Sequence, residues 1–353
     1  MNSSKGPFWL DIHGDGHQRG EIHGEALRES IDEALDRWLS SIAERTKSNP
    51  REYVRDFLAR TSYVSTVAER TPDLYAEVLG IARGSTQEPE HLLAYNFMDE
   101  EWRFRSESVD SCSVLATEHT EDGVVLLGQN MDLPAAMDGS QVALRIAAYE
   151  DDPAQIVLTG AGLIGLLGAN RSGLACCVNN LGQLPWSPRG LPVAFVIREV
   201  LRTQNVQSAA AFLRSVPHAV GQHYAVADSS GARGLECSAR GVVPGPETSL
   251  LVHTNHSLWD PVYADTRLPR ERDSSGSRTR LRALQDAANQ VVTATDLEEL
   301  FSYNTELCVV PGPPLYSATF CSAVFRLEST PVVRASLGRP DRTLWHTIEW
   351  GEP

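Results

Sequence analysis

A cysteine at position 112 is the residue of this sequence best placed to act as a nucleophile. Cys112 stands where a long helical segment gives way to the apolar run 113–117. Polar side chains end three other apolar runs, namely Asp132, Asn180 and Asn255. A thiol beside a proton acceptor can attack a carbonyl carbon, and an amide N–H can stabilise the oxyanion that forms. This set of residues predicts acyl transfer through a thioester.

A predicted hairpin explains how Asp132 could reach the thiol. Residues 113–117 and 124–127 are apolar and β-favouring, and the Glu-Asp-Gly sequence at 121–123 separates them as a turn. A hairpin of this length brings residues about twenty apart into register. The acidic end of the second strand should therefore lie close to Cys112.

Three other interpretations of these residues stay open. Cys112 could be a buried strand cysteine that only packs. It could instead stay inside an uncut chain and use His253 or His256 as its base, as in Cys–His acyltransferases. The same scaffold could also bind a small molecule or a partner without catalysis. We expect both histidines to be packing or supporting residues.

The periodicity of the sequence predicts an α+β fold with two different halves. Residues 21–105 have apolar residues at three- and four-residue steps and predict four helices, the second of them around residues 53–67. After residue 112 short apolar runs alternate with helical patterns, which favours two antiparallel sheets packed face to face with helices outside. The predicted strands are 113–117, 124–127, 142–149, 156–159, 174–179, 224–227, 250–254, 320–327 and 332–337, and the predicted helices between them are 192–202, 206–214, 278–289 and 296–303.

Composition excludes several classes of protein. The 353 residues include 42% hydrophobic and 22% charged residues and have a net charge of −15, which opposes binding to nucleic acid or anionic membranes. No apolar run approaches about eighteen residues, and the start lacks a signal-peptide pattern. Six cysteines without a CxxC pair predict free thiols and no metal site. We expect a soluble, cytoplasmic protein.

Several segments, taken in chain order, resemble one known family. The sequence is similar to the acyl-coenzyme A:6-aminopenicillanic acid acyltransferase family, the C45 group of N-terminal nucleophile (Ntn) hydrolases. The resemblance rests on residues 16–24 and 96–103, on Cys112 at a strand start, on the G-x-N-x-D pattern at 128–132, on the strand 174–180, on the H-x-N-H turn at 253–256 and on the Ser/Arg-rich segment 275–280.

This resemblance implies a four-layer αββα sandwich and an enzyme that activates itself. The chain would cut itself between Ser111 and Cys112, giving an α-chain of residues 1–111 and a β-chain of residues 112–353 that remain associated. The new amine of Cys112 would serve as the base for its own thiol. The substrate would be a small-molecule amide or an acyl-thioester, hydrolysed or transferred without a cofactor, and acyl-CoA is a candidate co-substrate.

The resemblance also implies roles for individual residues. Asp132 would orient the amine of Cys112, and Asn255 would donate to the oxyanion. Asn180, or its neighbour Asn179, would add a second donor or touch the substrate. Arg278 best matches the arginine that related Ntn hydrolases place beside the nucleophile.

Two positions depart from the pattern of that family. Ser111 stands where family members often have glycine before the cysteine. Met131 stands within the G-x-N-x-D pattern where an aromatic residue is common, which implies a different pocket wall.

Overall fold

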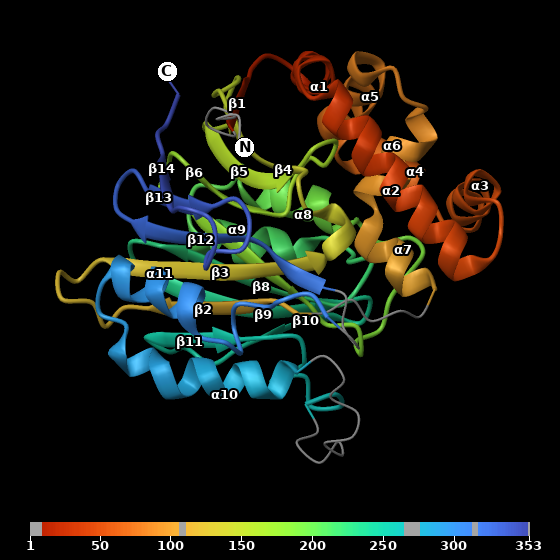
Figure 1. The fold of residues 1–353 in the computed structure, drawn as a ribbon. Helices are drawn as coiled ribbons and strands as arrows, with labels where there is room; N and C mark the ends of the chain where they lie inside the picture. Colours follow the sequence, from red (N-terminus) through yellow and green to blue (C-terminus); the bar gives the residue numbers. More distant parts are fainter. Residues whose placement is uncertain (1–8, 106–110, 265–275, 313–316, 352–353) are drawn as a thin grey trace.

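The computed structural model describes residues 9–105, 111–264, 276–312 and 317–351. Within these ranges the strands form two sheets that pack face to face (Figure 1). The larger sheet has the strand order β1-β4-β5-β6-β7-β8-β9-β10. Its strands are β1 (Trp9–Ile12), β4 (Gln141–Ile146), β5 (Gln155–Gly160), β6 (Leu167–Asn170), β7 (Ala175–Asn180), β8 (Gln222–Asp228), β9 (Gly231–Ser238) and β10 (Gly241–Pro244).

The smaller sheet contains the predicted hairpin near its centre. Its order is β11-β2-β3-β12-β13-β14. The strands are β11 (Leu250–His253), β2 (Ser113–Thr117), β3 (Val125–Pro134), β12 (Ser317–Leu327), β13 (Val332–Ser336) and β14 (His346–Ile348). All neighbours in both sheets are antiparallel except β1 and β4, which pair in parallel. The predicted pair of sheets is confirmed, with this one parallel pair added.

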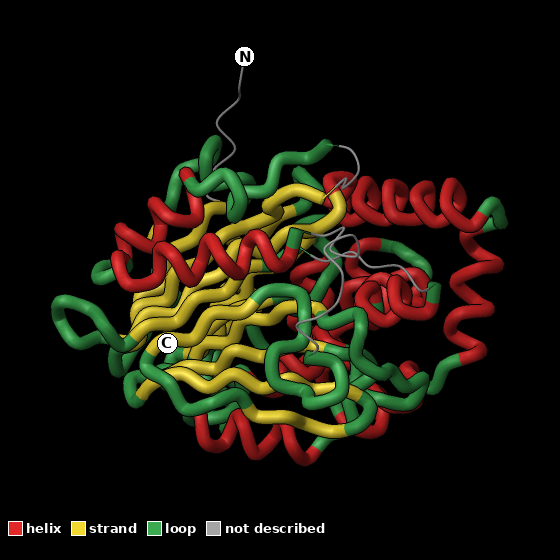
Figure 2. Tube along the Cα trace, turned by 90° about the horizontal axis from the view of Figure 1, so that it is seen from below, coloured by secondary structure: helices red, strands yellow, loops and turns green. Residues whose placement is uncertain are grey.

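Helices cover the outer faces of both sheets. The helices α8 (Val193–Val200) and α9 (Val206–Ser215) lie on the eight-stranded sheet, and α10 (Ser277–Ala287) and α11 (Ala294–Tyr303) lie on the six-stranded sheet. Figure 2 shows the strands stacked between helices on either side. The fold is therefore the four-layer αββα sandwich that the sequence predicts.

Successive residues of β3 contact different layers of the fold, α11 on one side and the opposite sheet on the other. A side chain at Gly128 would meet Phe301 of α11 at 2.7 Å, and Nδ2 of Asn130 donates to the Phe301 backbone oxygen over 3.0 Å. Between them, Gln129 faces the other sheet, where its Nε2 donates to the Val178 oxygen. Successive residues of a strand point to opposite faces, so glycine and asparagine here fit the close approach of a helix.

The segment before Cys112 forms a helical cluster at one end of the sandwich (Figure 1). Its helices are α1 (Gly16–Ala26), α2 (Arg28–Thr46), α3 (Pro50–Arg60), α4 (Tyr63–Arg70), α5 (Pro72–Ser85), α6 (Pro89–Asn96) and α7 (Met98–Phe104). The single helix expected around residues 53–67 is divided at Thr61, whose backbone is extended. The next residue, Ser62, donates its N–H to the Pro188 oxygen over 2.7 Å, a long-range contact that ends the helix.

Glycines let α1 and α5 pack with their backbones in contact. A side chain at Gly20 would lie 2.0 Å from the Glu77 backbone oxygen, and one at Gly80 would lie 2.4 Å from that of His17. Any larger residue would push the two helices apart. This explains the glycine spacing of the segment 16–24.

The described cysteines are all free, as expected, and all are buried, with Cys176 and Cys177 within the hydrophobic core. Among the described residues, no helix has both the length and the apolar character needed to cross a membrane.

Candidate active site

Cys112 immediately precedes β2 and lies inside the fold. Its side chain is 6% exposed, and Ser111 is 1% exposed. The backbone N–H of Cys112 donates to Oδ1 of Asn255 over 2.7 Å. Its Sγ lies 3.5 Å from Sδ of Met131 and 4.0 Å from the backbone oxygen of Asp132. The peptide bond before Cys112 is thus buried, and a side-chain amide fixes its nitrogen.

The pairing of β2 with β3 brings the thiol and the carboxylate strand together. Ser113 lies opposite Asn130, so Cys112 lies beside the next residues of β3, Met131 and Asp132. The predicted hairpin is confirmed, with a second strand that extends to Pro134.

Asp132 is a buried carboxyl whose two oxygens differ in their hydrogen bonding. It is 1% exposed, and its Oδ1 accepts a hydrogen bond from Oγ1 of Thr319 over 2.6 Å. No described residue bonds to Oδ2. Burial raises the pKa of Asp132 to about 8, although Arg280 and the Thr319 hydroxyl favour the charged form. The uncut chain therefore holds this group mostly protonated at neutral pH.

The side-chain amide of Asn255 has a fixed orientation. Its Oδ1 accepts from the Cys112 N–H and from Nη2 of Arg280 over 2.8 Å. A backbone N–H and a guanidinium can only donate, so the atom that faces them must be the oxygen. The other end, Nδ2, donates to the backbone oxygen of Asn180 over 3.1 Å. Asn255 thus meets the nucleophile through its oxygen, and the oxyanion role expected for its N–H stays a prediction.

A buried glutamate of the opposite sheet fixes the turn that follows Asn255. Glu236 of β9 is 1% exposed and accepts hydrogen bonds from Oγ of Ser257 over 2.6 Å and from the backbone N–H of Asp260 over 3.0 Å. Nε2 of His253 lies 3.0 Å from its Oε1. These bonds lower the pKa of Glu236 despite the opposing effect of burial. The carboxylate therefore ties both ends of the turn to the core.

The two asparagines at the end of β7 have different partners. Nδ2 of Asn180 donates to Oδ1 of Asp99 over 3.1 Å, and Asn180 lines a cavity beside Cys112. Oδ1 of Asn179 lies 2.8 Å from Nδ1 of His223. Of the two candidates, Asn180 is the one at the cavity.

The two candidate histidine bases differ in their surroundings. His253 is fully buried, and its ring nitrogens face Glu236 and the Thr254 backbone oxygen, 3.0 and 2.7 Å away. Both nitrogens are thus engaged away from the thiol. Nδ1 of His256 lies 2.7 Å from Oγ of Ser277 at the start of α10. These contacts support the expected packing role for His253.

The arginine that contacts Asn255 is Arg280, two residues beyond the one singled out in the sequence. Arg280 is 3% exposed, whereas Arg278 is half-buried. Residues two apart on a helix point to roughly opposite sides, so α10 directs only one of them to Asn255. The role expected for Arg278 stays a prediction. Thr319 and Arg280 are site residues that sequence analysis missed, although Arg280 lies in the segment 275–280 and Thr319 lies directly before the predicted strand 320–327.

A small cavity lies directly beside the thiol. Its volume is about 30 Å³, room for a water molecule but not for an acylated amine. Cys112, Asp132 and Asn180 line it together with Asp99 of α7. The segments before and after Cys112 thus share one cavity.

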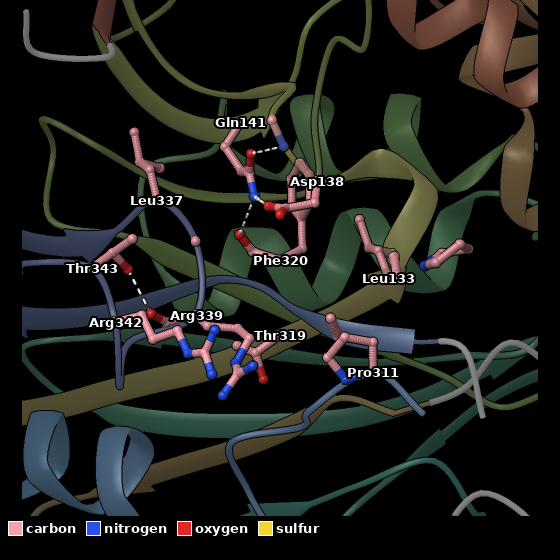
Figure 3. Close-up of a pocket in the computed structure, with 15 residues that line it drawn as sticks. Leu133, Asp138, Gln141, Pro311, Thr319, Phe320, Leu337, Arg339, Arg342 and Thr343 are labelled. Atoms are coloured by element: carbon pink, nitrogen blue, oxygen red, sulfur yellow. Dashed lines mark hydrogen bonds between the residues drawn. The ribbon is translucent and has the colours of Figure 1, made fainter. Parts of the chain in front are cut away.

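A larger pocket, shown in Figure 3, shares the lining residue Leu133 with this cavity. Its volume is about 580 Å³, within the usual range for small-molecule sites. Leu133 lines both spaces, and Thr319, which bonds to Asp132, lines the larger one. The carboxyl of Asp132 therefore lies close to the boundary between them.

This αββα architecture, with Cys112 directly before a strand of the smaller sheet, is the one that the resemblance to the acyltransferase family implies. A sequence model of the acyl-coenzyme A:6-aminopenicillanic acid acyl-transferase family matches residues 119–342, more than half of the chain. The protein belongs to this family.

Two further similarities accompany the family match. The chain is 29% identical over 242 residues to the acyl-coenzyme A:6-aminopenicillanic-acid-acyltransferase 40 kDa form of Emericella nidulans, a match that covers 68% of this chain and 66% of that relative. The chain thus spans slightly less than two thirds of the length of this curated relative. A penicillin V acylase structure from Agrobacterium tumefaciens aligns with 16% identity and a TM-score of 0.38, over 64% of this chain and 82% of that chain.

Proposed function

We propose that the protein is a self-cleaving amidohydrolase or N-acyltransferase whose nucleophile is Cys112 as a new N-terminal residue. The observation that carries this proposal is the hydrogen bond from the Cys112 N–H to Oδ1 of Asn255, beside the buried carboxyl of Asp132. A structural strand cysteine does not need its backbone nitrogen held by a side-chain amide.

Self-cleavage is the first step of the proposal. The thiol of Cys112 attacks the carbonyl carbon of Ser111, the C–N bond breaks, and the nitrogen takes up a proton to become a free amine. Water then hydrolyses the thioester, leaving a carboxylate on Ser111 and a free thiol. The α-chain is residues 1–111, and the β-chain is residues 112–353.

Turnover of the substrate uses the same nucleophile, and its base is now the amine that self-cleavage has released. The amine of Cys112, with a usual pKa of about 7.7–8.0, takes the proton of its own thiol near neutral pH. The thiolate attacks the carbonyl of an amide or thioester, and the leaving group departs with a proton. Water or an amine then releases the acyl group from sulfur. Hydrolysis by this route uses no cofactor, and an acyl-CoA would serve as an alternative acyl donor.

Contacts of the site suggest how each group contributes. Oδ1 of Asn255 is in place to accept from the new amine, because it already accepts from the same nitrogen in the peptide. Arg280 holds that oxygen from the other side. The Asp132 carboxyl, held by Thr319, lies at the cavity where the charged amine would stabilise its ionised form.

The test is a comparison of two buried cysteines of similar exposure, Cys112 (6%) and Cys308 (5%). Cys112→Ala should lower the hydrolysis of a panel of N-acyl amides at least about a thousandfold, because no other group can form the acyl-enzyme. Cys308→Ala should retain wild-type activity. Iodoacetamide at neutral pH should label Cys112 far faster than Cys308, whose pKa is raised by burial and by Asp341.

Two results would contradict the proposed function. One is amide hydrolysis that survives Cys112→Ala. The other is a wild-type protein that turns over no amide or thioester and whose two thiols react equally slowly, which would indicate a binding scaffold.

A further inference from the structure

Asp99 brings a second carboxyl group to the cavity beside Cys112. It lies in the first turn of α7, in the segment that precedes the expected cleavage site. Its Oδ1 accepts hydrogen bonds from Nδ2 of Asn180 over 3.1 Å and from Nε2 of Gln222 over 2.9 Å. Two amide N–H groups on one oxygen stabilise the ionised form and fix the carboxyl plane.

The contacts of Asn180 connect this carboxyl to the nucleophile. While its Nδ2 bonds to Asp99, its backbone oxygen accepts from Asn255, which in turn holds the nitrogen of Cys112. Asp99 is thus held at a fixed place relative to the reacting sulfur. A substrate group that binds Asp99 would therefore present its scissile carbonyl at a defined position.

The remaining lining residues give this cavity an acidic polar end and an apolar body. The cavity has two carboxyls, Asp99 and Asp132, and no lysine or arginine among its described lining residues. Oδ2 of Asp132 is buried and has no hydrogen-bond donor among the described residues. The apolar lining includes Met98, Trp102, Met131, Leu163, Val178 and Ile197.

This composition discriminates between substrates by charge. A second carboxylate brought into an apolar cavity beside Asp99 would meet like-charge repulsion with little solvent screening. A protonated amine would instead gain a charge-assisted hydrogen bond while its alkyl chain contacts apolar side chains. The cavity therefore favours cationic over anionic substrates.

We propose that Asp99 is a specificity-determining residue that binds a protonated amino group on the substrate, so that the preferred substrates are N-acylated diamines or similar cationic amides. This inference rests on the proposed function, since it names the substrate class of that site. The cavity of about 30 Å³ must widen to admit such a molecule.

The first experiment compares amides that differ only in charge. Three sets of N-hexanoyl amides would carry an amino, a methyl or a carboxylate group at the end of an alkyl amine of two to five carbons. For the best chain length, kcat/KM should be at least about tenfold higher with the amino group than with the methyl group, and lowest with the carboxylate. Asp99→Asn should bring the first ratio close to one, and Asp286→Asn, at an exposed position of α10, should leave it unchanged.

A second experiment measures the same preference without amide turnover. Methanethiosulfonate reagents transfer their thioalkyl group to a thiolate, forming a disulfide and releasing methanesulfinate. The 2-aminoethyl reagent should modify Cys112 at least about tenfold faster than the 2-sulfonatoethyl reagent, and Asp99→Asn should remove most of that difference. Because burial raises the pKa of Asp99, the preference should weaken as the pH falls.

The two experiments separate the possible failures. Amide turnover without a preference for cations overturns this inference and leaves the proposed function standing. A labelling preference that depends on Asp99, in a protein that turns over no amide, supports cation binding and contradicts the proposed function. A wild-type preference for the anionic amide or reagent overturns the inference directly, and that result needs no variant to fold.

Discussion

Asp132 is the residue whose protonation most directly connects the site to the stability of the fold. Thr319 bonds to its Oδ1, and among the described residues nothing bonds to its Oδ2. Charging this group without water is unfavourable, which is why its pKa rises to about 8. In the unfolded chain the pKa of an aspartate is about 3.9. Between these values the folded chain binds one more proton, so folding stability falls as the pH rises.

The substitution Asp132→Asn removes this titrating proton. In the uncut Cys112→Ala protein, adding Asp132→Asn should remove the loss of folding stability that accompanies a rise in pH. Relative to Cys112→Ala alone, the free energy of unfolding of the double variant should rise by about 2–5 kcal/mol between pH 4 and pH 8. Urea denaturation at pH 4, 6 and 8 measures this difference. If the exposed change Asp286→Asn is added to Cys112→Ala instead, the free energy of unfolding should depend on pH in the same way as in Cys112→Ala alone. The same result for Asp132→Asn would contradict the raised pKa of Asp132.

At this scale the sequence revealed only the local part of the site. The approach of Cys112 to Asp132 follows from one hairpin, because strand register is set over a short loop. Thr319 reaches Asp132 only through the pairing of β3 with β12, which has an irregularity after Thr319. Such a long-range register is not visible in local periodicity. Choosing Arg280 over Arg278 would have required knowing which face of α10 meets the sheet.

The turn after β11 is the element on which the geometry of Asn255 depends. Glu236 accepts from the backbone N–H groups of Leu258, Trp259 and Asp260, as well as from Ser257 and His253. The bonds from residues 257–260 cross from the opposite sheet to the turn, and the one from His253 reaches the end of β11. Glu236 therefore acts as a positioning residue that does not contact the reacting sulfur itself.

Glu236→Gln should show this role. The NH₂ group of the substituted side chain is a donor and would face the N–H and O–H donors that now bond to Glu236. The free energy of unfolding should therefore fall by about 2–4 kcal/mol. In protein that remains folded, kcat should fall about tenfold or more while KM stays nearly constant, because Asn255 is displaced rather than the substrate pocket. The matched control is Glu298→Gln on α11, which breaks an ion pair with Arg334 of β13 and should lower the free energy of unfolding by less than about 1 kcal/mol. Equal effects of the two changes on kcat would contradict a positioning role.

The elements predicted correctly are those with strong local periodicity. The apolar runs near 113, 175 and 320 became β2, β7 and β12. Strands β1, β6, β9, β10 and β14 were missed because they are short or contain glycine and charged residues. In β9, for example, Gly234 and Glu236 weaken the strand pattern, yet Gly234 permits Trp259 to pack against the strand and Glu236 holds the turn. Their places follow from tertiary contacts rather than local propensity.

Across the whole molecule, buried contacts join the segment before Cys112 to the rest of the chain. Arg198 of α8 forms an ion pair with Glu77 of α5 over 2.6 Å, with both side chains at most 1% exposed. Oδ1 of Asn96 accepts from the Ile164 N–H over 2.9 Å. Strand β1 also pairs with β4 inside the larger sheet. A cut between Ser111 and Cys112 would break none of these contacts, so the two chains should remain associated.

The mass of the purified protein tests the central claim most directly. Under denaturing conditions, intact mass spectrometry should find two chains, residues 1–111 and residues 112–353, and native conditions should find them as one complex. The matched Cys112→Ala protein should give the single uncut chain of the full 353 residues. A wild-type protein that remains one uncut chain and still hydrolyses amides would contradict the account, because the base for the thiol would then not be its own α-amine.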